Sequence, residues 1–447
     1  MSAAPSPGRW YNRVWRWHFY AGLFCIPLVL WLATTGSVYL WKPQIEALID
    51  RPYAHIAVPG ARASAADIAS AAVKAVPGSV LHRYQLPDTT EQAVQVIVGK
   101  AGNETRVYVN PQDLRIVKTV EEEDRLMRLV FRLHGELLIG NPGSWIVETA
   151  ACWAIVMILT GVYLWWPRGA TGLGGVLWPR LHLRGRGFWR DIHAVVAIWT
   201  SIFALFLILT GLPWANVWGD YFKQVRAVTG LAEGPQDWTT SSNAGRTKMM
   251  GEHAEHGGMT MDHPLADYRP LDRIIANVAP LGLAGPVLIA PPVARDDLWT
   301  AKSDSGDRPL RVNLTVDGIS GTIVGRKDFA DRHWVDRAVG YGIAAHEGQL
   351  FGLANQMLSL LAALGLFVTA ASGALMWWRR RPEGLLGAPL PLGTPRFGGV
   401  LVGALLLLAI LFPMFGLTLI AMLAAEWAVL RRFRPAARWL GLPPTSR

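Results

Sequence analysis

Charged residues and cysteine are both scarce in this sequence. Only 17% of the 447 residues are Asp, Glu, Lys or Arg, and there are 2 cysteines, Cys25 and Cys152. Two cysteines within apolar stretches exclude a disulfide framework and a cysteine-rich zinc site, and no Cys-x-x-Cys-His motif is present for covalent haem attachment. The chain also lacks a dinucleotide-binding glycine motif, a P-loop, a nucleophile elbow and a zinc-protease motif. The sequence therefore offers no site for NAD, ATP or peptide hydrolysis.

The low charge content reflects five long uncharged runs. A helix needs about 20 mostly apolar residues to cross the hydrocarbon core of a lipid bilayer. Trp and Tyr at the ends of the runs suit the membrane–water interface. We therefore predict a multi-pass membrane protein that lies in the lipid bilayer. The five runs are Phe19–Trp41, Thr149–Trp166, Ile192–Gly219, Gly348–Trp378 and Phe397–Ala425.

The arginines predict the orientation of the chain. The net charge is +10, but the arginines lie beside the apolar runs, so we expect no nucleic acid partner. The positive-inside rule places such clusters in the cytoplasm. The N-terminus is then cytoplasmic, and the expected location is a bacterial inner membrane. The clusters are Arg9, Arg13 and Arg16; Arg168, Arg180, Arg184, Arg186 and Arg190; Arg379, Arg380, Arg381 and Arg396; and Arg431, Arg432, Arg434 and Arg438.

This orientation divides the chain into alternating membrane and periplasmic parts. Each periplasmic part has a helical stretch followed by strand-like runs. In the first part the helix is expected at 65–75, ended by Pro77-Gly78, and the strands at 93–99, 105–109 and 115–118. In the second part the helix is expected near 271–279, and the strands at 286–290, 298–302, 310–316 and 321–326. The expected fold is a membrane all-α bundle of four core helices plus a C-terminal apolar hairpin, with two small α+β periplasmic domains. The parts are 1–41 (cytoplasmic N-terminus and first span), 42–144 (first periplasmic domain), 145–214 (second span, Arg-rich loop, third span), 215–353 (second periplasmic domain), 354–378 (fourth span) and 379–447 (cytoplasmic loop, hairpin and tail).

The last apolar run allows two structures. Residues 397–430 have Pro413 and Gly416 near the middle. Each half has about 15–17 residues, slightly few for a full crossing. We favour a helical hairpin, because it keeps Arg396 and Arg431 on the same side of the membrane. One long tilted helix is the alternative, and it would place the C-terminus outside.

An internal repeat relates the two halves of the chain. His18 and His193 each stand 18 residues before a glycine. His134 and His346 each stand 27 residues before a glycine and 32 before a tryptophan. The repeated unit is a histidine and a span, a periplasmic domain, and a second histidine and span. The glycines are Gly36, Gly211, Gly161 and Gly373.

The repeat places two histidines at each membrane face. His18 and His193 open spans that run outward, so both lie at the cytoplasmic face, and His134 and His346 lie at the outer face. Neutral imidazole is a good axial ligand for haem iron, and facing helices of a bundle can hold such a cofactor. We predict two b-type haems, one for each pair. Alternatively, these histidines pair with backbone or lipid headgroups, or His182 of the inner loop replaces one inner ligand.

A Met- and His-rich segment, residues 248–263, follows the third span. Thioether and imidazole ligands together favour copper. The segment could therefore bind metal on the periplasmic side, and a polar insertion with incidental methionines is the alternative. The candidate ligands are His253, His256, His263, Met259 and Met261.

Five short motifs stand out in the sequence: Arg16-Trp17-His18, the segment 133–138 around His134, Asp191-Ile192-His193, the segment 346–352 and the strand-turn segment 107–111. Together they resemble the PepSY-associated transmembrane family, and the resemblance covers about residues 9–430. The family includes iron-regulated inner-membrane proteins and ferric-siderophore reductases. The resemblance implies PepSY-like periplasmic domains and a periplasmic ferric-siderophore as the substrate, which is reduced so that iron leaves as Fe(II). It also implies two b haems, with His18, His134, His193 and His346 as their ligands.

Three functions remain open at this stage. The first is a transmembrane di-haem metalloreductase of a ferric-siderophore, in which cofactors at both faces carry electrons from an unknown cytoplasmic or membrane donor. The second is a periplasmic copper reductase or copper-handling membrane protein that uses the segment 248–263. The third is a cofactor-free scaffold whose PepSY domains regulate periplasmic peptidases.

Overall fold

The computed structural model describes residues 8–56, 58–231, 267–292, 297–392, 399–430 and 432–442. Contacts within the chain define two compact units, which we call the helical unit and the sheet unit. The helical unit comprises Met1–Ser37, His134–Phe222 and Leu358–Arg447, and the sheet unit comprises Val38–Leu133 and Lys223–Met357.

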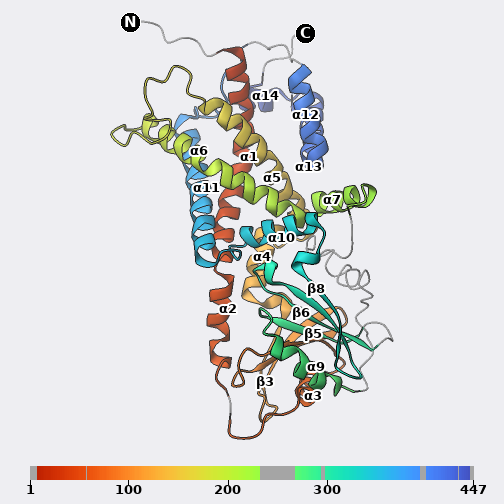
Figure 1. The fold of residues 1–447 in the computed structure, drawn as a ribbon. Helices are drawn as coiled ribbons and strands as arrows, with labels where there is room; N and C mark the ends of the chain where they lie inside the picture. Colours follow the sequence, from red (N-terminus) through yellow and green to blue (C-terminus); the bar gives the residue numbers. More distant parts are fainter. Residues whose placement is uncertain are drawn as a thin grey trace. The chain divides into compact units, whose positions relative to one another are not determined.

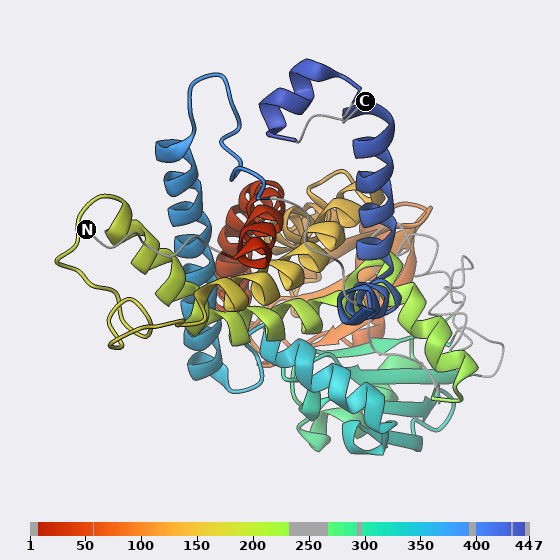
Figure 2. The same cartoon turned by 90° about the horizontal axis from the view of Figure 1, so that it is seen from above.

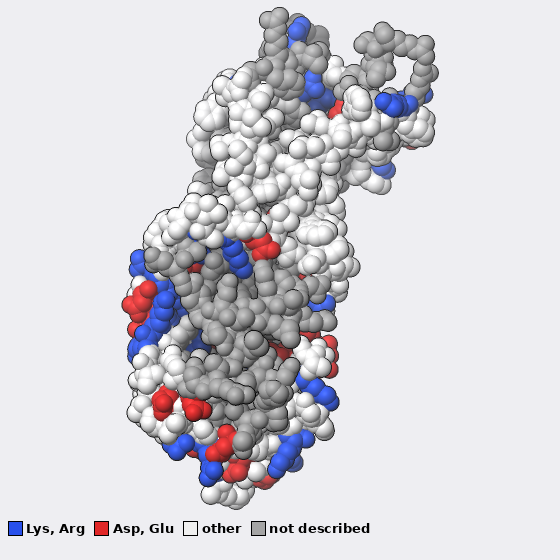
Figure 3. All heavy atoms as spheres, turned by 90° about the vertical axis from the view of Figure 1, so that its right-hand side faces the viewer, with Lys and Arg blue, Asp and Glu red and all other residues white. Residues whose placement is uncertain are grey.

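The helical unit is built on four long apolar helices, which confirm the four predicted core spans. Figures 1 and 2 show α1 between α5 and α11. Their surface is apolar: Ile202 is 71% exposed and Leu361 65% exposed, and the face drawn in Figure 3 carries almost no charge between the ends of the spans. The chain is a multi-pass membrane protein. The helices are α1 (Arg9–Tyr39), α5 (Asn141–Trp165), α6 (Arg186–Gly211) and α11 (Gly352–Arg380).

The last apolar stretch forms two short helices, α12 (Gly399–Leu411) and α13 (Pro413–Ala425). The chain leaves helical geometry at Phe412, with φ −130° and ψ 84°. A Cβ on Gly416 would lie 2.9 Å from the Cβ of Ala409, so α13 turns back against α12. This break excludes the single long helix. Each helix has 13 residues, which is about 20 Å of length and less than the roughly 30 Å hydrocarbon core.

The sheet unit holds one antiparallel sheet of 8 strands in the order β4-β3-β2-β1-β5-β6-β7-β8. The strands of the first half are β1 (Val80–Leu86), β2 (Val94–Lys100), β3 (Asn103–Val109) and β4 (Ile116–Glu121). Those of the second half are β5 (Val287–Ala290), β6 (Leu298–Ser303), β7 (Val312–Asp317) and β8 (Ile323–Asp328). The shorter helices are α2 (Lys42–Asp50), α3 (Ala65–Ala75), α4 (Leu126–Glu136), α7 (Asn216–Val228), α9 (Pro270–Val278) and α10 (Trp334–His346).

The two expected periplasmic domains, 42–144 and 215–353, differ from this arrangement in one respect. Each half does contribute one helix and four strands, but β1 pairs with β5, with Tyr84 opposite Ile289, and this joins the halves in one sheet. Unpaired strand edges are a liability, and pairing the two inner edges removes both. Strand patterns show which residues form strands but not which edges meet, so the sequence suggested two separate domains.

The sheet and the two helices α3 and α9 share one hydrophobic core. Ile68, Ala69 and Ala72 of α3 are fully buried with Leu271 and Ile274 of α9. Helix α3 begins where the Ser64 hydroxyl accepts a hydrogen bond from the backbone N–H of Asp67, which satisfies a free helix-end donor. The small alanine side chains allow α3 to lie close to the strands. The repeat therefore extends from the spans into the core of the sheet unit.

Candidate functional site

His18 of α1 and His193 of α6 lie together inside the helical unit. Their ring centroids are 6.5 Å apart and the ring planes are nearly perpendicular, at 82°. Both helices are spans, and each histidine stands near the N-terminal end of its helix. The structure therefore brings together the inner pair that the repeat predicted. His182, the alternative inner ligand, is exposed in the loop between α5 and α6.

Hydrogen bonds fix the tautomer of both rings. His193 Nδ1 lies 2.9 Å from the Thr369 carbonyl oxygen, which can only accept, so Nδ1 carries the proton. His18 Nδ1 lies 2.9 Å from Thr160 Oγ1. The Thr160 hydroxyl donates its own proton to the Val156 carbonyl at 2.7 Å, so its oxygen accepts from His18. In both histidines Nε2 is then the nitrogen with a lone pair, which is the form that binds metal.

Repeat glycines lie against both rings. A Cβ at Gly161 of α5 would be 3.3 Å from His18 Cε1, and a Cβ at Gly373 of α11 would be 3.3 Å from His193 Cε1. Glycine is the residue that allows such a close approach of backbone to a ring. Each imidazole is therefore held between its own span and the glycine-containing turn of a neighbouring span.

The inner pair fits a bis-imidazole metal site. Metal–imidazole bonds of about 2 Å put two coordinating nitrogens about 4 Å apart, and the half-width of each ring brings the centroids to roughly 6 Å. The separation of His18 and His193 agrees with this value. Two neutral imidazoles with fixed tautomers, on helices of one bundle, are the donor set that a b-type haem requires.

His134 of α4 is held in the same way in the helical unit. Its Nδ1 lies 3.0 Å from Thr35 Oγ1, and Thr35 donates to the Trp31 carbonyl at 2.9 Å. A Cβ at Gly36 would be 3.2 Å from His134 Cε1. The hydroxyl oxygen again accepts, so Nε2 of His134 presents the lone pair. His134 therefore has the same tautomer and the same kind of glycine contact as His18 and His193.

The turn after His134 carries backbone strain. Leu137 has φ 51° and Leu138 has φ 61°, a region that side chains with a Cβ rarely adopt. These two residues lie in the turn between α4 and α5. The corresponding turn after His346 uses glycine, with Gly348 at φ 72° and Gly352 at φ 56°. Sharp turns thus follow both outer histidines. Only the first turn is strained, and backbone strain is typical of functional sites.

His346 is the last residue of α10 in the sheet unit, and it is partly buried. Because His134 belongs to the helical unit, the pairing of His134 with His346 stays a prediction. The Met- and His-rich segment, with His253, His256, His263, Met259 and Met261, lies outside the described residues.

Hydroxyl side chains beside the histidines were not predicted. Each repeat glycine follows a threonine or serine. Among these hydroxyls, Thr160 lies at His18, Thr35 at His134, and Ser372 at His193, the last at 3.4 Å. The fourth hydroxyl is Thr210, before Gly211. The signal was present in the sequence as a Thr-Gly or Ser-Gly pair at every repeat glycine.

Comparison with known proteins agrees with these features. No curated protein matches the chain. The family model of the PepSY-associated TM region matches residues 15–380. This range includes most of α1, the other three spans, the sheet and all four repeat histidines. The chain therefore belongs to the PepSY-associated transmembrane family.

Proposed function

We propose that this protein is a di-haem b reductase of a bacterial inner membrane. It passes electrons from the cytoplasmic side to a periplasmic ferric-siderophore and thereby releases Fe(II). One observation carries the proposal: His18 and His193 lie 6.5 Å apart between ring centroids, as two axial ligands of one iron would. The choice of a ferric-siderophore as the substrate follows from the ferric-siderophore reductases of the PepSY-associated transmembrane family.

The protein residues supply position and protonation state at the inner site. Thr160 and the Thr369 carbonyl hold the proton on Nδ1 of His18 and His193, which keeps Nε2 free to coordinate. A hydrogen bond at Nδ1 also raises the basicity of the ligand nitrogen. When bound, haem would supply one-electron redox chemistry.

The spacing along α1 suits transfer across a membrane. Thr35, the residue that holds His134, lies seventeen positions after His18 along α1. This is about 25 Å of helix, close to the roughly 30 Å hydrocarbon core. An electron cannot cross this distance through lipid alone, so one site near each face is the arrangement that a transmembrane reductase needs. Reduction of one ferric ion consumes one electron from the unknown donor.

The test is a reduced-minus-oxidised visible spectrum of the purified full-length chain, with haem quantitation. The expected preparation is red, and dithionite shifts its Soret band. His18→Ala and His193→Ala should remove one haem component, and His134→Ala and His346→Ala the other, since each iron needs both imidazoles. A colourless wild-type protein would refute the proposal and favour the peptidase scaffold.

A second experiment, on a deletion variant, distinguishes iron from copper as the substrate. Deletion of residues 248–263 should leave ferric-chelate reduction nearly unchanged. Under the copper hypothesis the same deletion abolishes metal reduction. The donor set of methionine and histidine in that segment suits copper and not ferric iron, so the two outcomes are distinct.

A further inference from the structure

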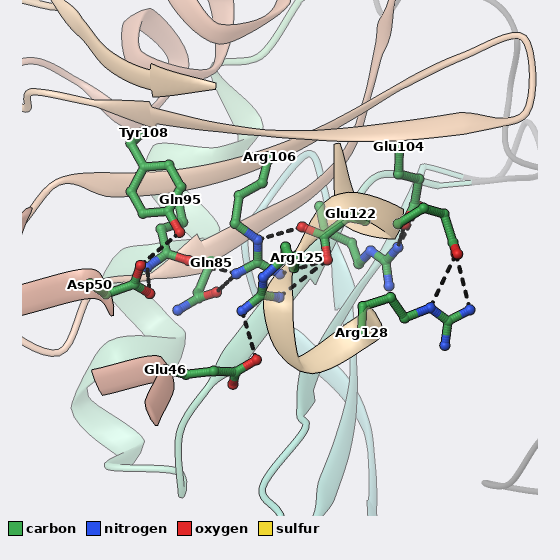
Figure 4. Close-up of polar contacts among 12 residues, drawn as sticks. Glu46, Asp50, Gln85, Gln95, Glu104, Arg106, Tyr108, Glu122, Arg125 and Arg128 are labelled. Atoms are coloured by element: carbon green, nitrogen blue, oxygen red, sulfur yellow. Dashed lines mark hydrogen bonds and ion pairs between the residues drawn. The ribbon is translucent and has the colours of Figure 1, made fainter. Parts of the chain in front are cut away.

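In each half of the chain, an ion pair of the sheet unit joins two short helices. One of them carries an outer histidine (α4 or α10), and the other follows a span (α2 after α1, or α7 after α6). In the first half, Arg125 stands directly before α4, which carries His134. The Arg125 guanidinium lies 3.0 Å from Glu46 of α2, the helix that follows α1. In Figure 4 the Arg125 side chain lies between Glu46 and Glu122, and its distance to Glu122 is 3.2 Å. Helix α4 is therefore anchored at its start.

The second half has a corresponding ion pair with its charges exchanged. Arg226 of α7, the helix that follows α6, binds Asp336 of α10 through two hydrogen bonds of 2.8 and 2.9 Å. Both side chains are buried, at 1% and 7% exposure. Asp336 lies ten residues before His346, much as Arg125 lies nine before His134. A two-pronged Arg–carboxylate contact fixes geometry more tightly than a single bond.

In the first half the ion pair belongs to an antiparallel series of contacts. Along α4 the order is Arg125, Phe131, His134. Their partners run in the opposite direction: Glu46 at 3.0 Å, Tyr39 with ring centroids 6.0 Å apart, and Thr35 at 3.0 Å. Arg125 stands directly before α4, and His134 lies near the other end of the same helix, nine residues later. A shift of α4 at Arg125 is therefore carried along the helix to His134.

We propose that the Glu46–Arg125 and Arg226–Asp336 pairs are repeat-related clamps that position the outer histidines. They are positioning residues, because neither pair belongs to the histidine site itself. The inference rests on the proposed function, since it assigns the two clamps to the outer haem alone. The His18–His193 site has its own supports, Thr160 and Thr369, and does not depend on the clamps.

The experiment compares Arg125→Met and Arg226→Met with Arg83→Met in the purified full-length chain. Arg83 is a matched control, because it also pairs with a carboxylate of the sheet, Glu104, and is 25% exposed against 22% for Arg125. It contacts neither histidine-bearing helix through that pair. Haem content and a redox titration are measured on each variant.

Both clamp variants should lose the spectral component that is lost in His134→Ala, and keep the component that is lost in His18→Ala. Haem per chain should fall from about two to about one, as for loss of one bis-imidazole site. Arg83→Met should keep both components.

The inference is overturned if both clamp variants keep two unchanged components, or if they lose the inner component equally. Should Arg125→Met fail to fold, Arg125→Lys and Arg226→Lys keep the charge but lose the planar guanidinium. At Arg125 that group contacts Glu46 and Glu122, and at Arg226 it makes the two-pronged contact with Asp336. Those variants should shift the midpoint potential of the outer component only, and an unchanged potential counts against the clamps. A wild-type chain without haem refutes the proposed function as well, so the two failures are distinguishable.

Discussion

Replacing Thr160 by valine tests the inner site most directly. Valine keeps the branched shape but removes the oxygen that accepts the His18 Nδ1 proton at 2.9 Å. A hydrogen bond of this kind contributes about 0.5–1.5 kcal/mol net. Haem affinity should therefore fall by about 2- to 10-fold. The bond makes the ligand more basic, which favours ferric iron, so its loss should raise the midpoint potential of the inner component. A tenfold change in affinity corresponds to about 60 mV for a one-electron couple, which is the upper limit of the expected shift.

The assay is a redox titration of the visible spectrum in Thr160→Val, Thr35→Val and Thr34→Val. Thr35→Val should shift the other component, because Thr35 holds His134. Thr34 is the matched control. It lies next to Thr35 in α1, its hydroxyl also donates to a carbonyl of its own helix, Leu30 at 2.8 Å, and it is exposed. If Thr160→Val shifts the inner component no more than Thr34→Val does, the hydroxyl does not hold His18 and the tautomer argument is wrong.

Three further results are expected. Gly161→Val should remove the inner haem component and keep the outer one, since even a Cβ would lie 3.3 Å from His18 Cε1. Burial alone would raise the pKa of Glu104, but Arg83 and His82 hold this pKa at about 2. The ionised Glu104 carboxylate stabilises the sheet fully above about pH 4.5, and this stabilisation is lost as pH falls towards 2. Acid should therefore accelerate hydrogen exchange of β3 in wild type, and should do so less in Glu104→Gln. Ile289→Ala, at a fully buried position of β5, should cost about 2–5 kcal/mol and accelerate exchange in β3 and β7 alike.

The spans and the helix α3 could be predicted because their signals are local. A run of about 20 apolar residues is sufficient for a span. The Pro77-Gly78 pair marks the end of α3, and its observed bounds, Ala65–Ala75, are those expected. No contact with distant residues is needed for either inference.

Strand β1 was missed because its pattern is irregular. Its pairing with β2 shifts register between Leu81 and Arg83. A bulge of this kind breaks the alternation of buried and exposed residues that identifies a strand. The amphipathic helices α4 and α10 were missed for a different reason: both are short, and each lies directly before a much stronger apolar run.

The histidine pair could be predicted, whereas its hydroxyl partners were not. Equal spacing from His18 and His193 to a glycine places both at the same depth of equivalent spans, and this is information within one helix. Thr160 lies on a different span from His18, so their contact depends on how the helices pack. The repeat still contained the clue, because a hydroxyl precedes each of the four glycines.

The pairing of β1 with β5 also bears on how such a chain could arise. The strand order is symmetric about that contact, with four strands of one half on each side. A polypeptide of half this length would expose the edge of β1, and two copies could bind each other there across a twofold axis. Fusion of two such copies in one gene would keep this interface and would guarantee one copy of each half in every chain.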